Sequence, residues 1–388
     1  MLTVLRNADV FAPEPKGRCD LLVGGERVLW MGASLADLPA SLAATIVDLE
    51  GMRLIPGLID GHVHLTGGGG EAGPESRVPP PMLSRYTRGG VTSAIGVLGT
   101  DDVTRSTAEL VVTARALIAE GLSAWCHTGG YHLPPTTLTG SVRGDIAQID
   151  RIIGVGEVAL SDHRSSQPTL DELLRLASEA HVAGLMTGKA GIVHLHLGDG
   201  ERGLALIRDA LVNSELPARV FNPTHVNRRK ALFDEALSLT SVGCHIDITA
   251  FPVATDEDAW SAAAALSRYF ESGAPRDRVT VSSDGGGCLP RFDDAGRVVQ
   301  MGVGDSGALM ETIAELLRDG AALPDVLPAF TSNVSRLLRL PHKGRIDVGS
   351  DADLVVLDDS HQVRHVMARG AWHVRDGVPL RFGTFEER

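Results

Sequence analysis

The chain has 388 residues, of which 43% are hydrophobic and 22% are charged, so it is long enough for one large globular domain or two ordinary ones. The formal net charge of −13 argues against a nucleic-acid partner, because phosphate binding needs a basic surface and no block of the sequence supplies one. The first residues carry no leader pattern, and no apolar run approaches the roughly 18 residues of a membrane span. We therefore expect a cytoplasmic protein without a membrane partner.

Both ends of the chain are predicted to form short strands. Residues 2–54 contain strand-like pieces without a convincing helix, and 344–375 repeat this pattern with Gly and Asp turns. Neither end is long enough to bury a core of its own. We therefore predict one small β-sandwich domain built from residues 1–54 together with 341–388.

The middle of the chain alternates between strand-like and helix-like segments. Apolar runs predict strands at 56–64, 91–98, 122–127, 152–161, 192–197, 219–225, 244–249 and 279–283. Helical spacing lies between them at 102–120, 169–181, 201–213, 229–239, 256–272 and 306–318. This alternation predicts an α/β fold, a (β/α)8 TIM-like barrel over 55–340, with a doubly wound sheet as the competitor. Metal-ligand residue types at the carboxyl ends of the strands favour the barrel, which gathers its active site there.

The first predicted barrel strand ends in His62 and His64. Side chains alternate across a strand, so these two share a face and can bind one metal ion, although this spacing alone is a weak signal. Residues of ligand type also end other predicted strands: Glu157, His196, His225 and Asp284. Four histidines and two carboxylates at one rim predict a pair of divalent, zinc-like ions.

Two points about the histidines stay open on spacing alone. His194 and His196 share a strand face, so either could be the metal ligand. Four other histidines are expected to be hydrogen-bonded core residues: His163, His181, His245 and His342.

The sequence resembles the amidohydrolase superfamily, whose first strand carries Pro-Gly-x-Ile-Asp-x-His-x-His, as residues 56–64 do here. More specific segments resemble the bacterial isoaspartyl dipeptidases, also called β-aspartyl peptidases. These segments are 67–74, 98–101, 128–132, 139–142, 161–165, 223–228 and 282–285. The resemblance implies a metal-dependent hydrolase barrel that cleaves the isopeptide bond of β-aspartyl dipeptides.

The resemblance also implies which residues bind two Zn²⁺ ions. His62 and His64 would hold one zinc with Asp284, and His196 and His225 would hold the other. His196 is preferred over its neighbour because the ligand in the family directly precedes an apolar residue and Gly-Asp. Other divalent metals remain open.

Glu157 stands where the best-known members carry a carboxylated lysine. It offers the same single negative charge and two oxygens, so it can bridge two metals. Its shorter arm requires the backbone to come closer, and Gly156 permits that approach. The alternative is that Glu157 is merely a polar strand-end residue and that the second metal is weak or absent. Lys189 lies too far along the chain to replace it.

The chemistry implied is attack by a metal-bridging hydroxide. Two metals lower the pKa of a shared water and polarise the scissile carbonyl. By resemblance, Asp284 orients the hydroxide and passes its proton to the leaving amine, while Tyr131 donates a hydrogen bond to the oxyanion.

Charge is expected to set specificity. Glu71 can pair with the substrate ammonium, and Arg164 and Arg228 can bind carboxylate in bidentate fashion. Thr100 and the backbone amide of Gly69 would complete the site for the aspartyl carboxylate. Cys288 stands where the family usually has serine, and a thiol is a poorer donor, so the substrate assignment is open at this position.

Three alternatives differ in the residues they require. Another amidohydrolase, such as a D-aminoacylase or a cyclic amide or imide hydrolase, would keep the metal ligands and discard the Glu71 and Arg228 contacts. A non-enzymatic scaffold predicts missing ligands, and a purely structural zinc prefers a closed four-coordinate cage. The resemblance further implies a homo-oligomer, commonly an octamer, that acts on a small-molecule substrate.

Overall fold

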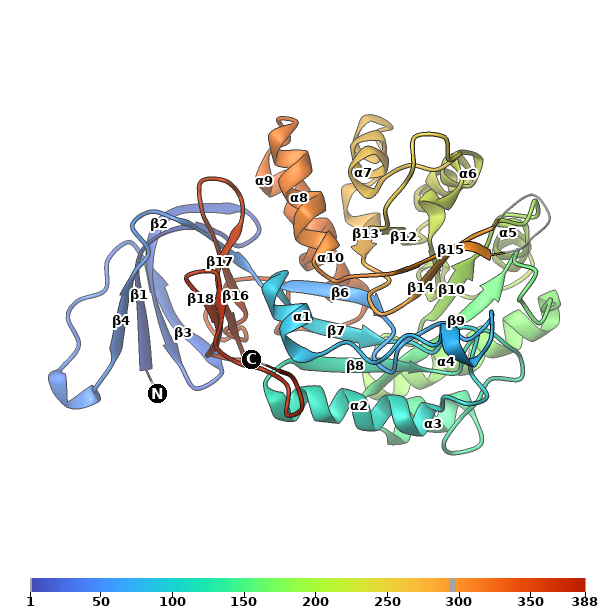
Figure 1. Ribbon diagram of the computed structural model, residues 1–388, viewed down its shortest axis with the longest axis horizontal. Helices are drawn as coiled ribbons and strands as arrows, with labels where there is room; N and C mark the ends of the chain where they lie inside the picture. Colours follow the sequence, from blue (N-terminus) through green and yellow to red (C-terminus); the bar gives the residue numbers. More distant parts are fainter. Residues whose placement is uncertain (1, 293–297, 388) are drawn as a thin grey trace.

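Strands from both chain ends form one sheet on one side of the molecule (Figure 1). The computed structural model describes residues 2–292 and 298–387. The nine strands of this sheet are β1 Leu2–Phe11, β2 Pro15–Gly24, β3 Arg27–Gly32, β4 Thr45–Asp48, β5 Arg53–Pro56, β16 Leu354–Leu357, β17 Val363–Ala368, β18 Ala371–Arg375 and β19 Val378–Pro379. Strand β5 is parallel to β1 and antiparallel to β16, so it joins the two ends of the chain. Their apolar side chains share one core, which includes Leu5, Leu54 and Met367.

A barrel of parallel strands follows the first part of this sheet. Its strands are β6 Leu58–Val63, β7 Val91–Gly96, β8 Ser123–Thr128, β9 Ile152–Leu160, β10 Val193–Leu197, β11 Phe221–Thr224, β12 Ile246–Thr249 and β13 Val279–Ser282. Strands β6 to β11 pair in chain order, and β12 pairs with β13. Strand β11 lies beside β12, and a parallel bridge between Val63 and Gly285 closes the ring. The predicted fold class, a TIM-like barrel with a sheet domain from both chain ends, is confirmed. The exact division at residues 54 and 340 stays a prediction.

The helices of the barrel are α1 Leu83–Arg88, α2 Thr107–Glu120, α3 Val142–Gln148, α4 Leu170–Thr187, α5 Ala205–Val212, α6 Lys230–Ser241, α7 Ala262–Glu271, α8 Ala308–Arg318, α9 Leu323–Val326 and α10 Ser332–Leu337. Four of them, α2, α3, α4 and α7, begin at a side-chain cap. The helices predicted from 102 and 256 begin later, because the side chains of Ser106 and Ser261 accept the amide hydrogen bonds that start α2 and α7. Helix α4 begins with a capping box between Thr169 and Glu172. Within the described ranges, no helix has the length and apolar character needed to cross a bilayer.

Two elements near the barrel rim were not predicted. Helix α3 has 7 residues, too few for helical periodicity to emerge. The hairpin of β14 Cys288–Phe292 and β15 Val298–Val303 directly follows the last barrel strand. Cys288 and Gly302 of this hairpin line the cavity at the rim, so the hairpin forms one wall of the site.

Candidate active site

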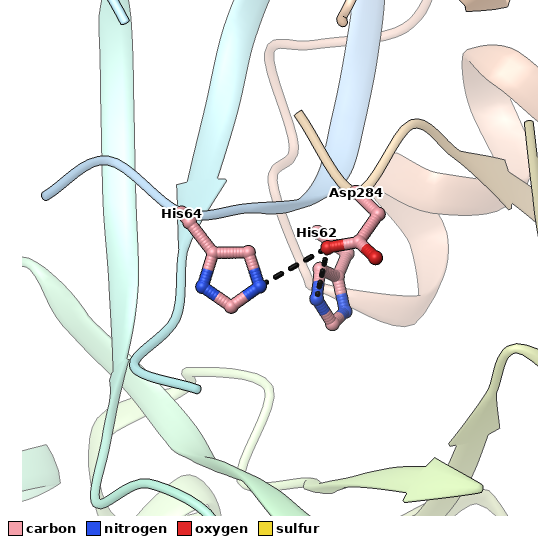
Figure 2. Close-up of side chains that lie close together, drawn as sticks. All are labelled: His62, His64 and Asp284. Carbon is pink, nitrogen blue, oxygen red and sulfur yellow. Dashed lines mark ion pairs between the residues drawn. The ribbon is translucent and has the colours of Figure 1, made fainter. Parts of the chain in front are cut away.

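His62 and His64 converge on one carboxylate at the rim of the barrel. His62 lies in β6, His64 follows it, and Asp284 follows β13, which the ring closure brings beside β6. The Nε2 atoms of His62 and His64 lie 3.5 and 3.0 Å from Oδ1 of Asp284. In Figure 2, dashed lines join both imidazoles to this one carboxylate oxygen.

Glu157 in β9 lies between two pairs of histidines. Its Oε1 is 3.4 Å from Nε2 of both His62 and His64. Its Oε2 is 3.1 Å from Nδ1 of His196 and 3.4 Å from Nε2 of His225. The two oxygens of one carboxylate therefore face two separate sets of nitrogen atoms, as a bridging group must.

Gly156 allows the backbone of β9 to approach β10 at this point. A Cβ atom on Gly156 would lie 2.6 Å from the carbonyl oxygen of His194, and the φ angle of 150° is one that other residues rarely adopt. Glycine at this position therefore lets Glu157 sit deep in the rim despite its short side chain.

The donor atoms of this cluster fit a divalent metal ion. Buried Nε2 of His62, Oε1 of Glu157 and Oδ1 of Asp284 have no hydrogen-bond partner among the described residues. Potential ligand atoms lie within 4.8 Å of one another in two groups, His62 with His64 and Asp284, and His62 with Glu157 and His225. Buried polar atoms normally have partners, and imidazole nitrogen with carboxylate oxygen is the donor set that zinc prefers. His196 belongs to neither group, although it contacts Glu157.

The electrostatics of the cluster favour a positive charge at its centre. Burial raises the pKa of Glu157, but the neighbouring histidines outweigh this effect and hold its pKa well below the usual range. The pKa of Asp284 is lowered in the same way by His62 and His64. Burial lowers the pKa of His62, yet the two carboxylates raise it well above its usual value. Ionised carboxylates that favour a nearby cation are suited to metal binding.

His194 lies behind His62 instead of beside Glu157. Its Nε2 is 2.8 Å from Nδ1 of His62, and its Nδ1 is 2.7 Å from the side-chain oxygen of Asn222. Burial lowers the pKa of His194 to about 4, so it is neutral at pH 7 and can accept a hydrogen bond from His62. Of the two histidines that spacing left open, His196 is the one in contact with Glu157.

All predicted substrate-binding residues line one cavity of about 510 Å³. They are Gly69, Glu71, Thr100, Arg164, Arg228 and Cys288. The cavity lies beside the metal-ligand cluster, which is made of the predicted ligands His62, His64, Glu157, His196, His225 and Asp284. The same cavity is lined by Tyr131, His64, Glu157, His196 and Asp284. The loops after β6, β7, β8, β9, β11 and β13 and the β14–β15 hairpin thus bring positive and negative side chains to a single space next to the buried cluster.

The charged residues of the cavity are linked to one another. Arg164 donates from Nη1 to Glu71 at 3.2 Å and makes a bidentate pair with Asp162. The second oxygen of Glu71, Oε2, is buried and has no hydrogen-bond partner among the described residues. Nη1 of Arg228 lies 3.3 Å from Nε2 of His196. One carboxylate oxygen therefore remains available to a cationic group in the cavity.

Tyr131 follows β8 and reaches the cluster through its hydroxyl group. The hydroxyl oxygen lies 2.8 Å from Nδ1 of His196, and the side chain is buried. Burial and the charges of Glu157 and Asp162 raise the pKa of Tyr131 well above 10, although Arg164 and Arg228 lower it. The phenol is therefore neutral at pH 7 and can donate a hydrogen bond.

Residues that sequence reasoning missed hold the loops of the cavity in place. The buried guanidinium of Arg105 donates to the carbonyl oxygens of Thr66, Gly68 and Gly69, which fixes the glycine-rich loop. Asp102 accepts from the backbone and the ring of His132 in the loop that carries Tyr131. Neither contact has a sequence signal, because each joins loops that follow different strands.

Two of the predicted core histidines, His163 and His342, are exposed instead. His163 was expected in the core, but 67% of its side chain is exposed at the cavity mouth, where the loop after β9 turns outward.

Comparisons with known proteins agree with this geometry. The family model described as the amidohydrolase family matches residues 53–373. A β-aspartyl dipeptidase from the thermophilic keratin-degrading Fervidobacterium islandicum AW-1, solved with β-Asp-Leu dipeptide, is 41% identical over 100% of both chains, with a TM-score of 0.92. A dihydropyrimidinase from Brevibacillus agri NCHU1002 shares the fold at 18% identity and a TM-score of 0.69, covering 99% of this chain and 97% of that one. An imidazolonepropionase from Anaeromyxobacter sp. (strain K) is 27% identical over 91% of this chain and 89% of its own length. The chain is therefore a hydrolase that belongs to the amidohydrolase family.

Proposed function

We propose that this protein hydrolyses the isopeptide bond of β-aspartyl dipeptides with the help of two zinc ions. The observation that carries the proposal is one cavity in which Glu71, Arg164 and Arg228 lie beside the buried metal-ligand cluster. A β-aspartyl dipeptide carries an ammonium and two carboxylates next to the bond to be cleaved. The similarity to the Fervidobacterium islandicum protein, which was solved with β-Asp-Leu, supports the same substrate class.

The ligands of the first zinc would be His62, His64 and Asp284, and those of the second His196 and His225. Glu157 would bridge them, which the positions of its two oxygens support. When bound, the ions would supply Lewis acidity that activates a water molecule and polarises the scissile carbonyl.

Asp284 would move the proton. Its carboxylate is ionised, because His62 and His64 hold its pKa low, and one buried oxygen has no hydrogen-bond partner in the described structure. This oxygen would be the atom that accepts a proton from the attacking water, which the carboxyl group would then pass to the leaving amine. Tyr131 would donate its hydroxyl hydrogen to the developing oxyanion. The neutral state of the buried phenol supports this role.

Charged groups would orient the dipeptide. The unpartnered Oε2 of Glu71 would accept from the substrate ammonium, and Arg164 and Arg228 would bind carboxylate. Thr100 and the amide of Gly69 would complete the aspartyl subsite. Cys288 would be the weakest contact, since burial and nearby carboxylates raise the pKa of its thiol to about 11 and keep it a neutral, poor donor.

Hydrolysis of β-Asp-Leu and of α-Asp-Leu by the zinc-reconstituted protein, without added bicarbonate, tests this function. We expect cleavage of the β isomer alone. Both isomers carry one ammonium and two carboxylates, but only in the β isomer do the ammonium and the free aspartyl carboxylate share one carbon atom, so the charges lie differently relative to the bond to be cleaved. Zinc binding without cleavage of either isomer would refute this substrate and direct the search to D-aminoacyl or cyclic amide and imide substrates.

The cellular setting is a further part of the proposal. We propose a cytoplasmic homo-oligomer, with an octamer as the form that the family resemblance implies. Light scattering after size-exclusion chromatography measures the number of subunits, and a monomer would contradict it.

A further inference from the structure

Asp162, which follows β9, contacts both the metal-ligand cluster, through His196, and the substrate cavity, through Arg164. Its Oδ2 lies 3.0 Å from Nε2 of His196 and 2.7 Å from Nη2 of Arg164. Its Oδ1 accepts from Nε of Arg164 at 3.0 Å. The carboxylate thus joins a residue of the metal-ligand cluster to a residue of the substrate cavity.

The contact is built into the rim and shielded from solvent. Only 1% of the Asp162 side chain is exposed. A Cβ atom on Gly198 would lie 2.4 Å from Cβ of Asp162, so glycine is what lets the loop after β10 pack against it. This packing holds His196, two residues before Gly198, within hydrogen-bond distance of the carboxylate.

The partners of His196 determine its tautomer. Both ring nitrogens of His196 face carboxylates, Nε2 that of Asp162 and Nδ1 that of Glu157. With a metal ion on the Glu157 side, Nδ1 would be the ligand atom, so Nε2 would carry the proton and donate it to Asp162. The longer contact from Arg228, at 3.3 Å, does not compete, because the same Nη1 also faces the carbonyl oxygen of Leu197. Nδ1 of His196 would then be unprotonated. It lies 2.8 Å from the hydroxyl of Tyr131, which can donate to it, and 3.1 Å from Glu157, on the side where a metal ion could bind.

We propose that Asp162 is a positioning residue that couples metal binding at His196 to carboxylate binding at Arg164. One oxygen serves both partners, so a change in the hydrogen bond to Arg164 alters the hydrogen bond to His196. A substrate carboxylate that draws Arg164 away would strengthen the bond from His196 and raise the basicity of Nδ1. Coupling of two binding events is reciprocal, so metal at His196 would favour carboxylate at Arg164.

The substrate half of this inference rests on the proposed function, but the metal half does not. The experiment therefore measures Zn²⁺ affinity of the full-length apoprotein by chelator competition, without substrate. We expect Asp162→Asn to weaken zinc binding by about 10–100-fold, the usual effect of losing a carboxylate that orients a metal-binding histidine. Asp145→Asn is the matched control, because Asp145 is also a buried carboxylate that accepts several hydrogen bonds, among them those of Thr128 and Leu138, yet in the described structure it accepts from none of the proposed ligands. It should leave zinc affinity unchanged.

A double-mutant cycle tests the coupling itself. Arg164 touches none of the proposed ligand atoms that face Glu157. Even so, Arg164→Met should change the zinc affinity by about fivefold or more. In the Asp162→Asn background, the same substitution should leave the zinc affinity unchanged. An Arg164 effect that persists without Asp162 would be a through-space charge effect and would overturn the coupling. Unchanged zinc affinity in Asp162→Asn would overturn the positioning role.

A measurement on the unmodified protein guards against a variant that fails to fold. In ¹⁵N NMR spectra of the zinc-loaded protein, His196 should carry its proton on Nε2 and bind through Nδ1. A proton on Nδ1 would overturn the inference. Failure of the unmodified protein to bind zinc would instead refute the proposed metal centre, which distinguishes the two failures.

Discussion

The barrel rim and the chain-end sheet treat buried carboxylates in opposite ways. In the sheet, Asp20 accepts from two backbone amides and from Arg6, and Asp353 accepts from Lys343 and the amide of Arg369. At the rim, by contrast, some buried carboxylate oxygens have no hydrogen-bond partner among the described residues. The buried carboxylate oxygens without a hydrogen-bond partner in the described ranges all lie there, in Glu71, Glu157 and Asp284.

This difference separates structural from functional polar residues. A satisfied buried carboxylate stabilises the fold, whereas an unpartnered one costs free energy unless a ligand completes it. The sheet therefore serves as a support with its buried carboxylates paired, whereas the rim has carboxylate oxygens without a hydrogen-bond partner that could bind a metal and a substrate. Four substitutions test this comparison.

The largest effect is expected from Asp284→Asn at the rim. The amide cannot take up the proton of the attacking water, so kcat for β-Asp-Leu should fall by about 10²–10⁴-fold. The melting temperature of the apoprotein should fall only modestly, because the variant loses the ion pairs of Oδ1 with His62 and His64 but no other contact of that atom. Steady-state kinetics and thermal unfolding measure both effects. A normal kcat in this variant would contradict the functional role of the Asp284 carboxylate.

Tyr131→Phe should follow in size. Loss of a donor to the oxyanion is expected to lower kcat by about 10²–10³-fold with little change in KM. Tyr269→Phe is the control, since the hydroxyl of Tyr269 is also buried but donates to the carbonyl oxygen of Pro275 within the fold. Equal losses in both variants would show that Tyr131 acts through the fold alone.

Asp20→Asn should have the reverse profile. It weakens hydrogen bonds from Arg6 and two backbone amides, so the free energy of unfolding should fall by about 2–3 kcal/mol while kcat/KM stays unchanged. Chemical denaturation and kinetics of the same preparation check this. A loss of kcat/KM at unchanged stability would contradict the structural assignment of Asp20.

The pH dependence of that stability difference has a definite sign. Burial raises the pKa of Asp20, but its hydrogen bonds outweigh burial and lower the pKa below its value in the unfolded chain. The stabilisation by Asp20 should therefore be complete above about pH 4 and be lost as the pH falls through the lower pKa of the folded state. The difference in the free energy of unfolding between the unmodified protein and Asp20→Asn should therefore shrink as the pH falls. A difference that grows in acid would contradict this assignment.

Cys288→Ser is expected to have the smallest effect. Cys288 lines the cavity, and a hydroxyl donates a stronger hydrogen bond than the neutral thiol. The KM for β-Asp-Leu should fall by about 2–10-fold with kcat nearly unchanged, which corresponds to one added hydrogen bond. Cys19, Cys126 and Cys244 all belong to hydrophobic cores, so Cys288→Ala is the control, since it removes the thiol without adding a donor and should not lower the KM. An unchanged KM would show that the thiol does not meet the substrate.

The sequence predicted the strands well because their signal is local. Each barrel strand overlaps a predicted apolar run, and the two-residue spacing of His62 and His64 placed them on one face. The hairpin of β14 and β15 and the exposed position of His163 were missed, because both depend on how a rim loop turns after its strand.

Asp162 marks the limit of sequence reasoning at the site itself. It stands two residues before Arg164, so the sequence contained a carboxylate next to a predicted substrate-binding residue. Its contact with His196, however, is made only where the loops after β9 and β10 pack together. Spacing along the chain carries no information about that packing.

By itself, the sequence determined the element order, the ligand types at the strand ends and the family resemblance, since each depends on residues close together along the chain. Only the tertiary structure decided which atoms meet: that His196, and not His194, faces Glu157, and which carboxylate oxygens lack partners. The physical reason is closure of the barrel. It brings β13 against β6 and sets strands far apart in sequence at distances of a few ångströms, which no local pattern encodes.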